Sequence, residues 1–335
     1  MGSEMCIRDS SEEWSRAFRS CSPPARAAVH SVAQGFWSPF PPMKPAPFEY
    51  AAPPTLDEAL AILSENDPDE VKILAGGQSL MPLLNMRLAR PELLLDLTRI
   101  EELGGVRAME SGVSIGALAT KRDVEDSNLV RDRNPLFMES TVMIGHPQIR
   151  NRGTVGGSMV QADPAAEYPA VAVALGAELV ARGPGGERVI EADDFFITYL
   201  TTALEPGEIL TEIRVPDLPA GTGWSIQEVA RRHGDFAIVG AVAMLRLESG
   251  VCVDPRIVIF GASDRPRRHP EAEALLTGQR PSAEVFESAG QAVAQSLEDP
   301  TDDVHASADY RRDLARVLCA RTLAEAVERA EGGGA

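Results

Sequence analysis

Two short stretches of the chain pair glycines with hydroxyl side chains, a combination that suits the binding of phosphate groups. They are "ILAGGQSLMPLL" at residues 73–84 and "GTVGGSMVQADPAAEYPA" at residues 153–170. Glycine has no Cβ and tolerates positive φ, so paired glycines can turn backbone N–H groups towards one bound anion. The hydroxyls of Ser79, Thr154 and Ser158 can add hydrogen bonds to phosphate oxygens without adding charge. The two stretches therefore predict a pair of phosphate-binding loops.

Neither stretch matches a better-known phosphate-binding motif. Both lack the dinucleotide fingerprint GxGxxG and the phosphate loop GxxxxGK[ST], so a Rossmann fold is not indicated. A Gly–Gly pair after a strand is also typical of an ordinary tight turn. The residues alone favour a phosphate-bearing ligand between two α/β units, and the tight-turn alternative stays open.

The composition narrows the class of protein. With 335 residues, of which 44% are hydrophobic and 24% charged, the chain is typical of a globular protein of two or three domains. A net charge of −18 argues against a nucleic-acid partner. No apolar run reaches the roughly 20 residues that span a bilayer. The four cysteines and five histidines form no CxxC, HxxH or HExxH pair, so we expect free thiols, no metal site and a cytoplasmic protein.

The first 42 residues differ from the rest. They hold four acidic and four basic residues, so the whole net charge belongs to residues 43–335. Proline and serine clusters break any periodicity, and the basic start and apolar core of a signal peptide are both lacking. We expect residues 1–42 to be a disordered, non-native extension and Met43 to be the native start.

Local patterns predict two α/β units after this extension, at about 43–100 and 101–219. In the first, Thr55 and Glu58 form a capping box. The predicted elements of the first unit are a helix from Thr55 and strands at 71–75 and 92–97. Those of the second are a hairpin around Glu110–Gly112, helices from Thr120, at 135–145 and at 165–177, a strand pair within 177–192 and a strand at 208–216.

A third part is predicted at 220–330, after the linker "PDLPAGTG" at 216–223. Three strands come first and three helices follow. This order predicts a separate α+β domain with an antiparallel sheet backed by helices. The strands are expected at 225–230, 237–247 and 252–263, and the helices at 270–277, 281–295 and 308–330.

Longer segments around both glycine stretches carry a family resemblance. "AGGQSLMPLLNMRLARPELLLDL" and "IGHPQIRNRGTVGGSMVQADPAAEYPA" resemble the paired flavin loops of the FAD-binding medium subunit of molybdenum hydroxylases, which include aerobic carbon monoxide dehydrogenase and xanthine dehydrogenase. The likeness continues through "TTALEPGEILTEIRVP", "EVARRHGDFAIVGAVA" and "IVIFGASDRPRR". It implies an α+β fold: a two-subdomain FAD-binding domain of the PCMH (vanillyl-alcohol oxidase-like) type at 43–219, then a C-terminal α+β domain.

The resemblance also implies where FAD binds. Its diphosphate would lie between the two loops, with Asp163 and Glu167 at the ribose or adenine end and Leu204 against the flavin ring. The two acids are equally placed to be N-terminal acids of a helix, which favour the helix dipole. The implied loop residues are Leu74, Ala75, Gly76, Gly77, Gln78, Ser79 and Leu80 on one side and Thr154, Val155, Gly156, Gly157 and Ser158 on the other.

Some positions depart from the family pattern. Gln78 stands where the wider flavin superfamily often has a histidine that bonds covalently to the flavin, so we expect FAD to be held non-covalently. Ser158 and Gln161 stand where other members have Asn and His, which leaves the hydrogen bonds around the second loop open. The resemblance puts Arg231 and Arg232 near the flavin, whereas the residues themselves equally suit a solvated turn.

The function implied is that of an electron-transfer flavoprotein subunit. A molybdopterin large subunit would oxidise the substrate, a [2Fe–2S] small subunit would relay the electrons, and FAD would pass them to NAD, a quinone or oxygen. The family suggests a dimer of such heterotrimers, in the cytoplasm or at the inner face of the membrane. Two alternatives stay open: a stand-alone FAD oxidase or dehydrogenase, and a non-enzymatic protein that binds a phosphate ligand.

Overall fold

The computed structural model describes residues 44–332, so the expected disordered extension at 1–42 and the start at Met43 lie outside the described residues. The first α/β unit has a parallel sheet in the order β1-β3-β2. Its helix α1 begins after Thr55, whose side chain accepts the N–H of Glu58 at 3.3 Å, as the capping pattern predicts. The elements are β1 (Glu49–Ala51), α1 (Leu56–Glu65), β2 (Val71–Leu74), α2 (Leu80–Asn85) and β3 (Leu93–Asp96).

This first unit has a small core of its own. Leu56, Ala59 and Leu63 lie on one face of α1 and pack against the sheet. The cluster also includes Ile209, which starts the strand β10 (Ile209–Pro216) of the second unit. The first residue of a strand of the second unit therefore packs into the core of the first unit.

The second unit is built on an antiparallel sheet in the order β4-β5-β10-β6-β7. Its other strands are β4 (Val106–Met109), β5 (Gly112–Gly116), β6 (Glu178–Gly183) and β7 (Gly186–Glu191). Its helices are α3 (Lys121–Glu125), α4 (Asn128–Arg133), α5 (Pro135–Met143), α6 (Pro147–Arg150), α7 (Val155–Gln161), α8 (Glu167–Leu175) and α9 (Ala192–Phe195), and a small hairpin, β8 (Phe196–Thr198) with β9 (Thr201–Thr202), comes after α9.

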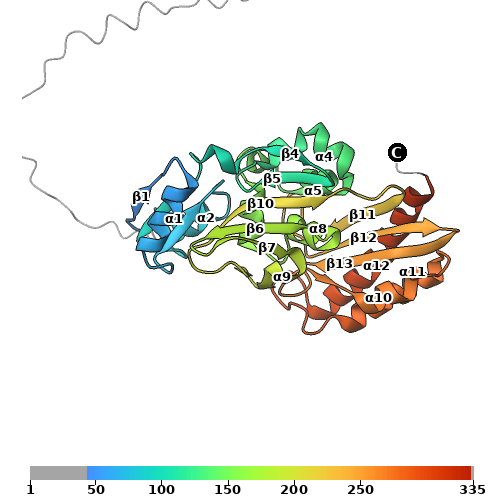
Figure 1. Ribbon diagram of the computed structural model, residues 1–335. Helices are drawn as coiled ribbons and strands as arrows, with labels where there is room; N and C mark the ends of the chain where they lie inside the picture. Colours follow the sequence, from blue (N-terminus) through green and yellow to red (C-terminus); the bar gives the residue numbers. More distant parts are fainter. Residues whose placement is uncertain (1–43, 333–335) are drawn as a thin grey trace, which may run out of the picture. The chain divides into compact units, whose positions relative to one another are not determined.

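The third part is the antiparallel sheet with helices that the order of its elements predicts. The helices cover one face of the sheet (Figure 1). The strands are β11 (Thr222–Val229), β12 (Val239–Glu248), β13 (Val251–Phe260) and β14 (Arg267–Arg268), and the helices are α10 (Pro270–Leu276), α11 (Ala283–Ser296) and α12 (Ala308–Glu331).

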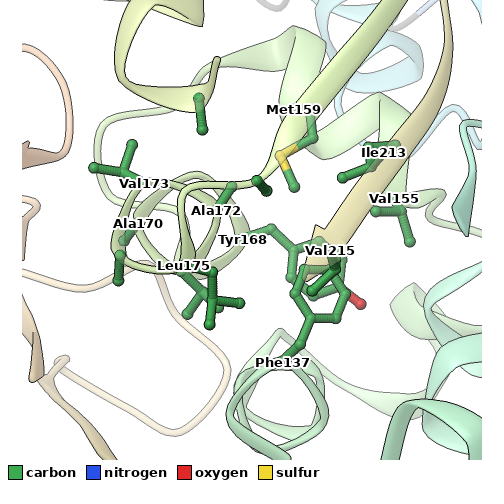
Figure 2. Close-up of a cluster of buried hydrophobic side chains, with 14 of the residues drawn as sticks. Phe137, Val155, Met159, Tyr168, Ala170, Ala172, Val173, Leu175, Ile213 and Val215 are labelled. Carbon is green, nitrogen blue, oxygen red and sulfur yellow. The ribbon is translucent and has the colours of Figure 1, made fainter. Parts of the chain in front are cut away.

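The other face of this C-terminal sheet packs on α8. Every residue of α8 is buried, because α5 lies on one side of it and strands β12 and β13 on the other. Within this core Tyr168 stacks on Phe137 with ring centroids 4.8 Å apart, and Val215 of β10 lies beside the pair (Figure 2). The same cluster reaches Val242 and Phe260 of the C-terminal sheet. The second and third parts therefore share one core.

Candidate functional site

A cavity of about 500 Å³ lies between the first and second units, a size usual for organic ligands. Both glycine stretches line it. Of the fifteen residues that the resemblance places around FAD, those that line the cavity are Ala75, Gly76, Gly77, Gln78, Ser79, Leu80, Thr154, Gly156, Gly157, Ser158, Asp163 and Leu204. A larger depression of about 610 Å³, between the segment after β10 and α10, contains none of them.

Three of the expected residues lie outside the cavity wall. Leu74 lines a neighbouring depression on the other side of the first loop. Val155 is fully buried in the core of the second unit. Glu167 is only 6% exposed and lies at the start of α8, behind the cavity.

The two loops touch each other through a glycine. A Cβ atom on Gly76 would lie 2.1 Å from the carbonyl oxygen of Arg152 and 2.8 Å from the Cα of Gly153. Only glycine leaves room for this backbone-to-backbone contact. Its neighbour Gly77 has a φ of 72°, a conformation that other residues rarely adopt. The first glycine pair thus shows both expected properties: Gly76 needs the absence of a Cβ atom, and Gly77 has a positive φ.

The second glycine pair differs from the prediction, because it forms the start of a helix. Thr154 caps α7 by accepting the N–H of Gly157 at 3.0 Å, and the helix contains both Gly156 and Gly157. Neither glycine has a positive φ. A Cβ on Gly156 would lie 2.6 Å from the Cβ of Ala117, so here glycine serves close packing instead. The positive φ expected of the second pair was therefore wrong.

The backbone donors of the two stretches are used differently. In α7 the N–H groups of Val155 and Gly156 donate at 2.9 Å to the carbonyls of Ala119 and Ala117, and that of Ser158 donates to its own N-cap carbonyl. None of the N–H groups of the first loop, residues 76–80, donates to another backbone group within residues 44–332. Unpaired N–H groups that line a cavity are natural anion-binding donors. The first loop therefore offers backbone donors, and the second offers hydroxyls.

A lysine that the sequence did not single out also lines the cavity. Lys121 is only 4% exposed, and its Nζ donates to Oγ of Ser158 at 2.8 Å and to the carbonyl of Thr154 at 3.2 Å. Burial lowers its pKa from 10.5 to about 8, against the opposing influence of Glu167. The only hint in the sequence was its position directly after the predicted helix cap Thr120.

Three carboxyl groups lie near the same wall: Glu167 is buried, whereas Asp163 and Glu228 are partly exposed. Burial raises the pKa of Glu167 from 4.5 to about 7, although Lys121 acts to lower it. Burial, helped by the charge of Glu167, raises the pKa of Glu228 from 4.5 to about 8, and burial also raises that of Asp163. Oε2 of Glu228 has no hydrogen-bond partner within the described chain. The raised pKa values of Glu167 and Glu228, about 7 and about 8, therefore favour the protonated form of these two groups near neutral pH.

The mouth of the cavity is apolar. Leu200 and Phe236, which line it, are 56% and 61% exposed and come from the second and third parts of the chain. Arg231 and Arg232 do not line the cavity: both side chains are more than half exposed and lie 3.8 Å from Asp235. The surroundings of both arginines are those of a solvated turn beside the cavity, which is one of the two interpretations given by the sequence.

The structure offers no metal centre in the part of the chain that it describes. Among residues 44–332 no group of three or more His, Cys, Asp or Glu side chains is placed to hold a metal ion. Cys252 and Cys319 are both buried and free. No helix in this part of the chain is long and apolar enough to cross a membrane.

Known proteins share this fold and sequence. The model of a domain described as the FAD binding domain in molybdopterin dehydrogenase matches residues 46–218, and that of the CO dehydrogenase flavoprotein C-terminal domain matches residues 224–326. The chain therefore belongs to the FAD-binding subunits of the molybdenum hydroxylase family, of the carbon monoxide dehydrogenase type, and FAD is its cofactor. The α+β fold and the family that the sequence predicts are both confirmed.

Individual relatives match over nearly their whole length. The chain is 41% identical over 289 residues to 6-hydroxypseudooxynicotine dehydrogenase complex subunit alpha of Paenarthrobacter nicotinovorans, covering 86% of this chain and 97% of the relative. It is 37% identical to the carbon monoxide dehydrogenase medium chain of Hydrogenophaga pseudoflava, covering 84% and 97%. A solved structure of carbon monoxide dehydrogenase from that organism superposes with a TM-score of 0.83 at 38% identity, covering 85% of this chain and 99% of that one.

Proposed function

We propose that this chain is the electron-transfer flavoprotein subunit of a molybdenum hydroxylase. It would hold FAD non-covalently in the cavity between the two glycine stretches and pass electrons from the [2Fe–2S] clusters of a small subunit to NAD, a quinone or oxygen. A molybdopterin large subunit would oxidise the substrate. The observation that supports this best is the cavity itself, because it is lined both by residues 76–80, whose N–H groups donate to no backbone group of the described chain, and by the hydroxyl-bearing residues of the second stretch.

The two stretches and the cavity mouth would bind different parts of the cofactor. The amides of residues 76–80 and the hydroxyls of Ser79, Thr154 and Ser158 would hold the diphosphate, and Asp163 would accept bonds from the ribose. Leu204 and the apolar mouth would exclude water from the flavin ring. FAD, when bound, supplies the redox chemistry, while the protein supplies position and electrostatics. Gln78 offers no group that attacks a flavin, and its Nε2 donates within the loop to Gly76 at 3.3 Å.

Dependence on partner subunits is supported by the relatives. They are named for carbon monoxide, caffeine and glyceraldehyde, which are chemically unrelated, yet each aligns with 84–86% of this chain. Because one kind of subunit aligns over this length in complexes with such different substrates, we propose that the substrate is chosen in another subunit. We also propose a dimer of heterotrimers, and a division of the chain into an FAD-binding domain at 43–219 and a C-terminal domain at 220–330, which the matches of the two family models at 46–218 and 224–326 support. A cytoplasmic location, or one at the inner face of the membrane, stays a prediction.

The cofactor assignment is tested first on the chain expressed alone. Its visible absorption spectrum should show flavin, and denaturation should release one FAD per chain that chromatography recovers unmodified. Flavin that stays with the denatured chain would contradict non-covalent binding. A colourless chain that takes up no added FAD would contradict the cavity assignment.

Co-expression with the two partner subunits tests the electron-transfer role. In the assembled complex, the substrate of the complex should bleach the flavin absorbance within seconds. The chain alone, loaded with FAD, should show no bleaching with the same substrate. Bleaching of the isolated chain would instead favour a stand-alone FAD oxidase or dehydrogenase.

A further inference from the structure

Lys121 places an ammonium group where the two glycine stretches meet. Its Nζ lies 2.8 Å from Oγ of Ser158 in the second stretch. A Cβ atom on Gly153 would lie 3.1 Å from this Nζ and 3.5 Å from Cγ of Gln78 in the first stretch. The ammonium therefore stands at the wall of the cavity, within reach of a group bound between the two stretches.

The charge of this lysine lacks a close partner. An ammonium has three N–H donors, and here two of them go to the neutral oxygens of Thr154 and Ser158. Within the described chain it forms no ion pair; Glu167 acts on it only through space. A buried charge without a counter-ion is costly, and an anion within hydrogen-bond distance removes much of this cost.

The cavity is where such an anion could approach the ammonium. On one side the ammonium lies 5.5 Å from the centroid of the Tyr168 ring, which is fully buried. On another it is closed by the backbone at Thr154. Lys121 also lines the cavity, and there the unpaired amides of residues 76–80 and the hydroxyl of Ser158 are donors of the kind that bind phosphate oxygens.

We propose that Lys121 binds the diphosphate of FAD and supplies the positive charge that the glycine stretches lack. This inference rests on the proposed FAD site in the cavity. Lys72 also lines the cavity, but it lies exposed on β2 and is solvated without a ligand. Substitution of Lys72 is therefore the matched control, because it removes a lysine from the same cavity whose charge stays in contact with water.

The test titrates FAD into the full-length apoprotein and follows the quenching of flavin fluorescence. Lys121→Met and Lys121→Gln should weaken FAD binding roughly 10- to 100-fold, the range of a hydrogen bond to a charged group. Lys121→Arg, which keeps the charge, should recover part of the affinity. Lys72→Met should change it less than about threefold, because an exposed charge is screened. Unchanged affinity in both Lys121→Met and Lys121→Gln would overturn the proposal.

Two further measurements separate charge pairing from a structural role. ADP should compete with FAD far better than adenosine does, and Lys121→Met should shrink this preference for the diphosphate. An equal loss of ADP and adenosine binding, or a large fall in the melting temperature of the apoprotein, would mean that Lys121 only supports the fold and would overturn the proposal.

The redox potential of the flavin tests whether Lys121 binds the diphosphate or the flavin ring. It should be the same in wild type and in Lys121→Gln, because the diphosphate is remote from the redox-active ring. A shifted potential would place the ammonium at the ring and overturn the diphosphate assignment. Failure of the wild-type chain to bind FAD would refute the proposed function itself, which is a separate outcome.

Discussion

Gly76 is the residue on which the approach of the two loops depends. An added Cβ would lie 2.1 Å from a backbone oxygen, which cannot swing away as a flexible side chain can. Gly76→Ala should therefore separate the loops, abolish measurable FAD binding and lower the free energy of unfolding by about 1–3 kcal/mol. Flavin content and denaturant melts measure both effects. Gly185→Ala, where a Cβ meets nothing within 4 Å, is the control. Full flavin content in Gly76→Ala would contradict the two-loop site.

Glu228 should make stability depend on pH. Its pKa is raised from 4.5 to about 8, chiefly by burial. A raised carboxyl pKa stabilises the folded state at pH below 4.5, and this contribution is lost as the pH rises through about 8. The melting temperature of the apoprotein should thus fall between pH 5 and pH 9. The side chain in Glu228→Gln stays neutral at every pH, so the melting temperature of this variant should fall less. Part of the fall should remain, because Glu167 titrates in the same range. An equally steep fall in the variant would contradict the burial of a protonated Glu228.

At the scale of elements, the helix α7 depends on its cap. Its first turn contains Gly156 and Gly157, and glycine disfavours helix by about 1 kcal/mol per residue. The side chain of Thr154 compensates by accepting the N–H of Gly157. Thr154→Ala should lower the free energy of unfolding by about 1 kcal/mol, whereas Thr154→Ser should keep the cap and most of the stability. Equal losses in the two variants, measured by denaturant unfolding, would show that the hydroxyl does not hold the helix.

The same helix shows why the sequence predicted some elements and missed others. The capping patterns at Thr55 and Thr120 and the alternation in the strands are local signals, and the corresponding elements are present. A Gly–Gly pair predicts a turn from local propensity, but the carbonyls of Ala119 and Ala117, remote in the sequence, accept the N–H groups of Val155 and Gly156 and help to fix a helix. The strand β1 is only three residues long, too short for any alternation to be seen.

The residues of the candidate site, like the elements of the fold, could be predicted only in part from the sequence. The glycines and hydroxyls of the two stretches could be found because their residue types carry the signal. Lys121 could not, because a lysine at the start of a helix is usually solvated, and its burial results from packing against Tyr168 and α7. Glu228 on β11 likewise becomes partly buried, within the electrostatic influence of Glu167, only in the folded chain. Burial of charge depends on tertiary packing, which a local pattern does not contain.

For the whole molecule, the shared core predicts that the FAD cavity and the C-terminal part unfold together. Residues of α8 pack on both sheets, and Arg329 of α12 forms ion pairs at 2.7 and 3.1 Å with Glu139 of α5. The ring of Trp224 lies 5.2 Å from the same guanidinium. The C-terminal part also has a hydrophobic cluster of its own under its helices, but the other face of its sheet belongs to the core around α8, so a defect in the C-terminal part should be felt at the cavity.

Leu276 and Leu275, neighbours on α10, provide the test. Leu276 is fully buried in the C-terminal core, whereas Leu275 is 45% exposed. Leu276→Ala should lower the free energy of unfolding by about 2–5 kcal/mol, and Leu275→Ala by less than about 0.5 kcal/mol. In urea, FAD release followed by flavin fluorescence and loss of helix followed by far-UV circular dichroism should keep one common midpoint, and Leu276→Ala should shift both together. If Leu276→Ala moved only the circular dichroism midpoint, the C-terminal part would unfold as a unit of its own, and the shared core would not couple it to the cavity.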